Sequence, residues 1–314
     1  MESVKFAENL AIFVEVAQAQ SFSAVARRRG MVASSVARQI DALESELKVD
    51  LFTRSTRALV KTDAGSLLFE RAVRILHELS DARNEVTSLE QGVSGLLRVS
   101  CLPAFGRRQV IPHLGALQEK YPGLHIELDL TERIVDPVVE RMDLVIRVGE
   151  QPDSSLFAQR LASQRYVICA APSYLARHGW PRHVRDLDRH RLIDRQHSTS
   201  MRGWRQLLGS EWTQHAVFAF ECDDCDARRL AVMQGLGIGL MPDWSIGEEI
   251  GKGRLIELPL EGVSPQPDTG IYLLRALPRP GAKVRAFSDY LAGLIGDPPR
   301  WQTAMRERPR REPA

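Results

Sequence analysis

The chain lacks the features that mark membrane and exported proteins, and its charge is nearly balanced. No apolar run is long enough to cross a membrane, and no apolar export segment stands at the N-terminus. The formal net charge is only +2, from 42 basic and 40 acidic residues, so any positive field must be local. We therefore expect a cytoplasmic protein with no membrane partner.

The sequence also lacks the motifs that mark common catalytic and cofactor sites. No glycine loop is placed to cradle a phosphate, and GLGIGLMP (residues 235–242) lacks the strand, glycine turn and helix of a dinucleotide site. The eight histidines show no metal-ligand spacing, and His183, His190 and His197 are expected at the surface. We therefore expect that the protein is not an enzyme and binds no cofactor or metal.

Helical patterns crowd the N-terminal part of the chain. Apolar residues from Leu10 to Ala17 follow the i, i+3, i+4, i+7 spacing of an amphipathic helix, which predicts a helix over residues 6–19. Ser21 and Ser23 are both suited to capping a short second helix around residues 24–26. This arrangement is typical of the first half of a helix-turn-helix.

A third helix follows a tight turn. Gly30 tolerates the positive φ of such a turn, and the next helix is predicted to start near Ala33. Its apolar residues between Val36 and Leu47 recur every three or four positions and must face the core. Polar residues are left outward at the end where a recognition helix meets DNA, and these are Ser34, Ser35, Arg38 and Gln39.

A wing is predicted after the third helix. Residues 51–52 and 59–60 read as short strands on either side of the turn RSTR, whose arginines suit phosphate or minor-groove contact. Shape, outward polar residues and wing arginines together predict double-stranded DNA binding. An architectural protein that binds DNA without sequence preference is one alternative. The predicted DNA-binding residues are Ser23, Ser34, Ser35, Arg38, Gln39, Arg54 and Arg57.

Three motifs carry a resemblance to a known family: FVEVAQAQSFSAVARR (13–28), ARQIDALESEL (37–47) and LFTRSTRALVKTDAG (51–65). The N-terminal region resembles that of LysR-type transcriptional regulators, and the rest of the chain resembles their effector domain. The resemblance implies a sequence-specific DNA-binding regulator that is switched by a small-molecule effector and controls RNA polymerase access. Family members usually carry a small hydroxyl residue where Val32 stands and a serine where Ala37 stands, so one cap and one polar contact are missing.

A long helix with a narrow apolar seam follows the wing. Thr62 is suited to cap it and Asp63 favours the positive end of its dipole. Its seam residues alternate four and three apart, which favours pairing with a second helix. The resemblance implies a linker helix that forms a homodimer, and family habit suggests a homotetramer. The seam consists of Leu68, Ala72, Ile75, Leu79, Ala82, Val86 and Leu89.

The remainder alternates predicted strands and helices, which favours an α/β domain with a parallel sheet. Strands are expected at 96–100, 125–130, 143–149, 218–222 and 271–276, YVICAAP from Tyr166 opens the second lobe, and helices are expected at Val110–Tyr121, Ile134–Met142, Asp224–Gln234 and Val284–Ile295. Two lobes joined by two crossings resemble the periplasmic-binding-protein fold of the family's effector domain.

These patterns divide the chain into four parts. A winged helix-turn-helix is expected over residues 1–62, the linker helix over 63–92, the effector domain over 93–297 and a disordered, arginine- and proline-rich tail over 298–314. Within the effector domain, lobe I is expected at about 96–162 and 268–297, and lobe II at about 163–267.

The resemblance implies an effector site in the cleft between the lobes, where ligands of such folds bind. One wall is expected from the turn after the first strand and the other from the turns after two strands of lobe II. Relatives often carry an asparagine or serine where Cys222 and Asp223 stand, so this wall is acidic and favours a neutral or cationic ligand, unless an arginine such as Arg195 or Arg202 neutralises it. The candidate effector-binding residues are Ser100, Leu102, Phe105, Gly106, Gln196, His197, Cys222 and Asp223.

The spacing of two cysteines leaves a second mode of regulation open. Cys222 and Cys225 form CDDC, a spacing used by redox pairs, while Cys101 and Cys169 lie in or beside strands. A thiol-based, redox-responsive regulator that uses Cys222 and Cys225 is therefore an alternative to a small-molecule effector.

Overall fold

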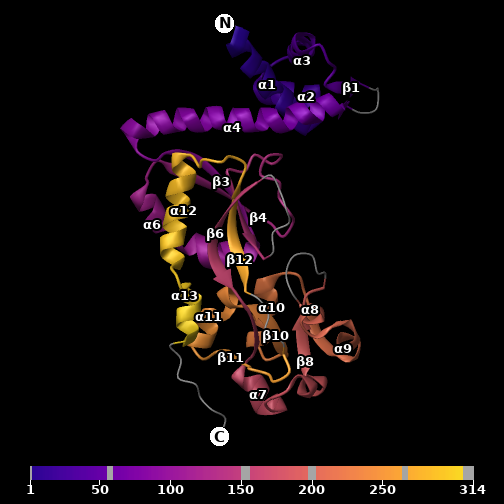
Figure 1. Ribbon diagram of the computed structural model, residues 1–314, viewed down its shortest axis with the longest axis vertical. Coiled ribbons are helices and arrows are strands. Elements are labelled where there is room, and N and C mark those ends of the chain that lie inside the picture. The colour runs from indigo at the N-terminus through magenta and orange to yellow at the C-terminus, as the bar shows by residue number, and fades with distance from the viewer. Residues whose placement is uncertain (1, 55–58, 150–155, 197–202, 264–267, 307–314) are drawn as a thin grey trace.

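The computed structural model describes residues 2–54, 59–149, 156–196, 203–263 and 268–306. Figure 1 shows three stacked parts: a small helical domain, a long helix that runs across beneath it, and two α/β lobes below that helix. The fold is thus an N-terminal winged helix-turn-helix, a linker helix and a two-lobed α/β effector domain, as the sequence predicts. Within the described residues, no helix is both long and apolar enough to cross a membrane.

The N-terminal domain packs three helices against a two-stranded wing. Ser21 Oγ accepts a hydrogen bond from Ala24 N at 3.2 Å, and Gly30 ends the second helix with φ +65°. Val32 stands at the next N-cap without a side-chain hydrogen bond, as expected from the missing hydroxyl. The elements are α1 (Glu2–Ala19), α2 (Phe22–Arg29), α3 (Ala33–Leu47), β1 (Phe52–Arg54) and β2 (Leu59–Lys61).

Helix α4 (Asp63–Gln91) joins this domain to the effector domain. Thr62 Oγ1 accepts a hydrogen bond from Gly65 N at 3.0 Å, which confirms the predicted cap. The first turns are anchored, because Phe69, Ala72 and Val73 are buried in the core of the N-terminal domain.

Lobe I is built on a mixed sheet with strand order β4-β3-β5-β12-β6. β3 is parallel to β4 and β5, whereas β12 is antiparallel to β5 and β6, so the expected all-parallel sheet is wrong. Among the described strands of this sheet, only β12, on which the chain returns to the lobe, runs opposite to the others, because β5 and β6 are both antiparallel to it. The strands are β3 (Gly95–Cys101), β4 (Leu124–Leu130), β5 (Leu144–Val148), β6 (Phe157–Gln164) and β12 (Thr269–Arg275).

The helices of lobe I differ from the predicted Val110–Tyr121 segment. The helical backbone begins at Pro103 and changes type three times. Pro112 lies in the 3₁₀ part and has no N–H to donate to an α-helical ladder. Ser100–Gly106 is therefore the end of a strand and the start of a helix rather than a turn. The elements are α5 (Pro103–Phe105), the π-helix η1 (Gly106–Val110), the 3₁₀ helix η2 (Ile111–His113), α6 (Leu114–Lys120) and α12 (Ala282–Ile295).

Lobe II has a second five-stranded sheet, with order β11-β7-β10-β8-β9. Its strands are β7 (Tyr166–Ala170), β8 (Arg191–Asp194), β9 (Val217–Glu221), β10 (Ile238–Pro242) and β11 (Ile256–Glu257). Its helices are α7 (Pro172–His178), the 3₁₀ helix η3 (Val184–Arg189), α8 (Trp204–Leu208), α9 (Ser210–His215), α10 (Cys225–Met233) and α11 (Asp243–Gly251).

The predicted helix over Ile134–Met142 is wrong. The segment forms a single turn, in which the Asp136 carboxylate accepts hydrogen bonds from Val138 N at 2.8 Å and Val139 N at 3.2 Å. Arg141 ends that turn with φ +56°, and Met142 N then donates to the Pro137 carbonyl. Caps that stand this close together leave no room for a longer helix.

The predicted disorder of residues 298–314 is also wrong for the part that the structure describes. Helix α13 (Arg300–Arg306) packs on α11 of lobe II, with Trp301 and Met305 buried. Gly247 of α11 allows the close approach, since a Cβ there would lie 2.5 Å from the Trp301 carbonyl oxygen. Two apolar residues four apart on a short helix suffice for this packing, although arginine and proline dominate the segment. Residues 307–314 lie outside the described residues.

Asp243, at the start of α11, predicts a pH dependence of stability. Burial raises the pKa of its carboxyl from 3.8 to about 6, opposed by the hydrogen bond from Gln302 of α13. The folded chain therefore holds this proton more tightly than the unfolded chain. This carboxyl stabilises the fold fully below pH 3.8, and that contribution is lost as the pH rises through about 6.

The variant Asp243→Asn cannot titrate at this position. Its free energy of unfolding, measured in urea, is expected to gain on that of the unmodified chain as the pH rises from about 4 to 7. A difference that stays constant over this range would contradict the buried titration.

Candidate DNA-reading and effector-binding sites

The N-terminal end of α3 presents the predicted reading face. Ser34 and Arg38 are exposed, Ser35 and Gln39 are half-buried, and Ser23 is exposed on the neighbouring α2. Val36, Ile40 and Leu43 of the same helix are buried in the domain core. The helix is therefore oriented by its apolar stripe, and the polar side chains at its N-terminal end stay accessible.

The wing is tied to the C-terminal half of α3. Glu44 Oε1 accepts hydrogen bonds from the backbone N–H groups of Leu51 at 2.7 Å and Phe52 at 3.1 Å, so it fixes where β1 starts. β1 and β2 pair antiparallel, as a hairpin requires. Arg54 is the last residue of β1, and Arg57 lies outside the described residues.

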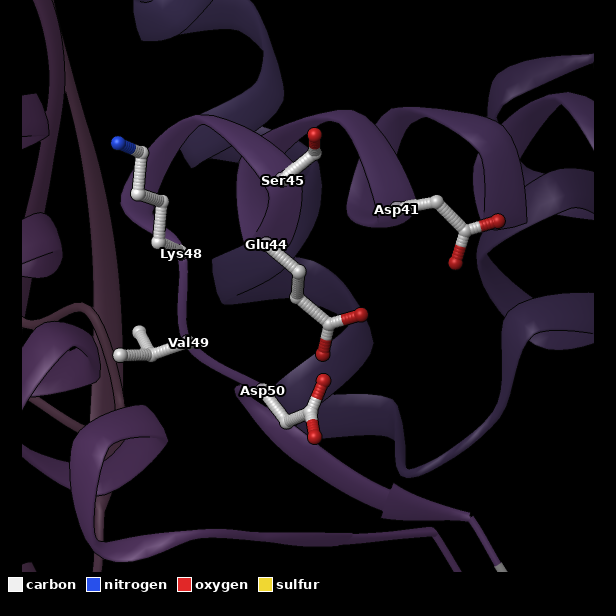
Figure 2. A pocket seen from close by; sticks show the side chains of 6 residues that line it. All are labelled: Asp41, Glu44, Ser45, Lys48, Val49 and Asp50. Carbon is white, nitrogen blue, oxygen red and sulfur yellow. The ribbon is translucent and has the colours of Figure 1, made fainter.

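The opposite end of α3 is acidic. Figure 2 shows a pocket there lined by Asp41, Glu44, Ser45, Lys48, Val49 and Asp50. Carboxylates at this end are repelled by phosphate, whereas the serines and arginine lie at the other end of the helix. The charge distribution along α3 therefore favours an approach to DNA by its N-terminal end.

The predicted wall of lobe I is largely packed. Ser100 is buried and its Oγ lies 3.3 Å from Asp129 Oδ2 on β4. Phe105 is fully buried edge-on against Trp244 of lobe II, with ring centroids 5.3 Å apart. Gly106 is a packing residue, because a Cβ there would lie 2.4 Å from Leu130 Cδ2. Only Leu102 of this set is half-buried.

The predicted wall of lobe II is more open. Gln196 is exposed, and Cys222 and Asp223 are half-buried. Cys222 N donates to the Asp194 carbonyl at 3.1 Å, which brings the ends of β8 and β9 together. His197 lies outside the described residues.

Polar contacts join the two lobes beside these walls. Arg107 of lobe I donates to Asp224 and Asp226 of lobe II, each at 3.0 Å. Gln109 Nε2 donates to the Trp244 carbonyl at 2.8 Å. These contacts hold the lobes together and would have to break or rotate if the cleft opened.

Three charged residues lie near one another between the lobes, and two of them, Glu132 and Arg228, were missed from the sequence, whereas Arg195 was considered only as a neutralising group. Glu132 follows β4, Arg195 follows β8, and Arg228 lies inward on α10. Burial raises the pKa of Glu132, and attraction from Arg195 and Arg228 opposes the shift, so the three share one region. A signal for Arg228 was present in the sequence, because it falls three residues after Cys225 and three before Ala231, both buried.

The N-terminal domain rests directly on lobe I through the segment that follows Glu132. Val138 is buried within the same apolar cluster as Phe13 of α1. Gln18 Nε2 of α1 donates to the Val139 carbonyl at 2.7 Å. The Glu15 carboxylate of α1 attracts Arg141. The hydrogen bond from Arg29 lowers the pKa of Glu15. The contact connects the DNA-reading domain with a segment that begins at Glu132, beside Arg195 and Arg228.

Two family models cover most of the chain. One, for bacterial regulatory helix-turn-helix proteins of the lysR family, matches residues 7–66, and the other, for the LysR substrate binding domain, matches residues 90–295. The chain belongs to the LysR-type transcriptional regulator family. Members of this family are DNA-binding transcriptional regulators with an effector-binding domain and not enzymes, so the regulatory function inferred from the sequence is confirmed.

Individual relatives of this LysR-type regulator match over nearly their whole length. The chain is 31% identical to the regulator DmlR of Escherichia coli, covering 93% of this chain and 95% of the relative. It is 30% identical to CrgA of Neisseria meningitidis, covering 92% and 97%. The solved structure of CrgA matches with a TM-score of 0.58 at 28% identity, covering 91% and 97%.

Proposed function

We propose that this LysR-type regulator reads its operator with the N-terminal end of α3 and grips the flanking backbone with its wing. Ser34, Ser35, Arg38 and Gln39 would enter the major groove, with Ser23 on the phosphate backbone beside it and Arg54 and Arg57 on the wing. The observation that carries this proposal is the division of α3 into a buried apolar stripe and an accessible polar N-terminal end.

Replacing Arg38 by alanine tests this assignment. The variant is expected to bind operator DNA roughly tenfold or more weakly, because a guanidinium contact to a base or phosphate is lost. Operator affinity would be measured by fluorescence anisotropy at fixed salt, with Arg185→Ala, an exposed arginine of lobe II, as the matched control. Equal affinities for Arg38→Ala and the control, both folded, would rule Arg38 out.

The effector is proposed to bind in the cleft between the lobes. The walls would be formed by partly accessible residues, namely Leu102, Gln196, Cys222 and Asp223. Buried residues would hold these walls in place, namely Ser100, Phe105 and Gly106. His197 is kept in the proposed site on the sequence alone. The polar contacts that join the lobes here make the cleft the place where a bound molecule alters lobe orientation.

We further propose that residues 131–142 carry the effector signal to the DNA-reading domain. The segment starts in the cleft at Glu132 and ends where Val138 and Val139 contact α1. Arg133 near its start forms a two-pronged ion pair with Glu140 near its end, which links the two parts of the segment. A shift of its cleft end is therefore transmitted to its other end rather than absorbed.

Helix α4 is proposed to form the homodimer. Ile75, Leu79 and Val86 are exposed along its predicted seam, with 47, 53 and 67% of each residue accessible. A second copy of α4 would cover them and set two reading heads side by side. By family resemblance the dimers pair into a tetramer, and effector-driven changes in the spacing of the heads alter RNA polymerase access in the cytoplasm.

The buried thiols favour this mode of regulation over the redox alternative. Burial raises the pKa of Cys225, and it raises the pKa of Cys101 to about 12. Both thiols therefore stay protonated near neutral pH, whereas the thiolate is the form that peroxide oxidises. Of the CDDC pair, only Cys222 is half-buried.

A further inference from the structure

Two arginines of lobe II have donors that no described residue accepts. Arg228 on α10 is only 1% exposed, and its Nε–H has no hydrogen-bond partner within the described part of the chain. Arg195, at the end of β8, has the same deficit at Nε and Nη1. A buried donor that has lost water and gained no acceptor destabilises the structure that holds it, and the cost is greater for a charged group. Both guanidinium groups are therefore available to donate hydrogen bonds to a ligand that carries acceptors.

Two of the nearby acids, Asp194 and Asp224, have other partners. The Asp194 carboxylate accepts hydrogen bonds from the backbone of Arg195 and Trp204. Asp224 accepts from Ala227 N at 2.7 Å and from Arg107 at 3.0 Å. Asp224 thus caps α10 and bridges the lobes, while Arg195 and Arg228 keep buried donors that no described residue accepts. One acceptor nearby, Asp226 Oδ1, likewise has no hydrogen-bond partner among the described residues.

Glu132 completes the environment from lobe I. It lies within electrostatic reach of both arginines, and burial acts against its charged form. An incoming carboxylate would compete with it for the guanidinium groups and would push on the first residues of the segment 131–142.

We propose that the effector carries a carboxylate that binds between Arg195 and Arg228. A carboxylate offers only acceptors, and its geometry matches the donor fork of a guanidinium. This assignment rests on the proposed effector function of the cleft, and it reverses the preference for a neutral or cationic ligand that the sequence indicated.

The test uses the full-length protein with matched pairs of acids and amides. The probes are acetate, succinate and benzoate against acetamide, succinamide and benzamide, and the readout is the binding constant from calorimetry at pH 7. At least one acid is expected to bind while its amide does not. Arg228→Gln should weaken that binding roughly ten- to a hundredfold, and Arg195→Gln should weaken it as well. Arg185→Gln should leave it unchanged.

Binding of amides in preference to acids, binding of no acid in the set, or equal binding to Arg228→Gln and the unmodified protein would each overturn the assignment. If Arg228→Gln fails to fold, the half-buried Arg195→Gln decides alone. Operator binding by the same preparations separates the two levels of inference. Specific DNA binding without acid binding removes only the ligand class, whereas loss of specific DNA binding removes the proposed function.

Discussion

Replacing Val138 by aspartate is expected to uncouple DNA binding from the effector. Val138 of lobe I is 6% exposed and lies within the apolar cluster of the N-terminal domain. A carboxylate there would be desolvated without a partner, so the two surfaces would separate. If residues 131–142 carry the signal, an effector that changes operator affinity about 5- to 150-fold in the unmodified chain should change it less than twofold in the variant.

The measurement is operator affinity with and without effector, together with effector affinity in the absence of DNA. Ile134→Asp is the matched control, because Ile134 lies in the same segment but is 72% exposed. The control should respond as the unmodified chain does, and both variants should still bind effector. A full response in Val138→Asp would show that the signal takes another route.

Replacing Trp301 by alanine is expected to cost the largest amount of stability, about 3–5 kcal/mol. Trp301 is 2% exposed, and α13 is seated on α11 so closely that a Cβ at Gly251 would lie 2.7 Å from the Ala304 carbonyl oxygen. Removal of the indole leaves a cavity that the neighbouring backbone cannot fill.

Urea unfolding of the full-length chain measures this loss, with Thr303→Ala as the control on the exposed side of α13. The control should change the free energy of unfolding by less than about 0.5 kcal/mol. Similar values for the two variants would mean that α13 contributes little to the folded chain.

Local rules were enough to predict the N-terminal domain. The apolar spacing from Leu10 to Ala17, the cap at Ser21 and the turn at Gly30 all act within a few residues, and the structure confirms the helices and the turn that they predict. The cap at Thr62 belongs to the same class.

The errors arise where distant residues decide the local structure. Residues 134–142 have helical spacing, but Asp136 and Arg141 cap the turn at both ends, and lobe I positions it against α1. The tail has a composition typical of disorder, yet Trp301 is buried where α13 packs on α11. The residues next to Trp301 in the sequence do not indicate this contact.

The charge of the cleft could not be predicted for the same reason. Asp223 and Asp224 mark an acidic stretch in the sequence, but only the fold shows that Arg107 engages Asp224 and that Arg228 is buried behind it. Which charges remain unmet depends on contacts between residues more than a hundred positions apart, such as Arg107 and Asp224.

Selection of genomic fragments by the purified protein tests the central claim most directly. The unmodified chain is expected to enrich a short dyad-symmetric motif from a few promoters, and Arg38→Ala should lose that enrichment while remaining folded. Enrichment of fragments without a shared motif, or an unchanged motif with Arg38→Ala, would contradict the account of α3 as the element that reads the operator.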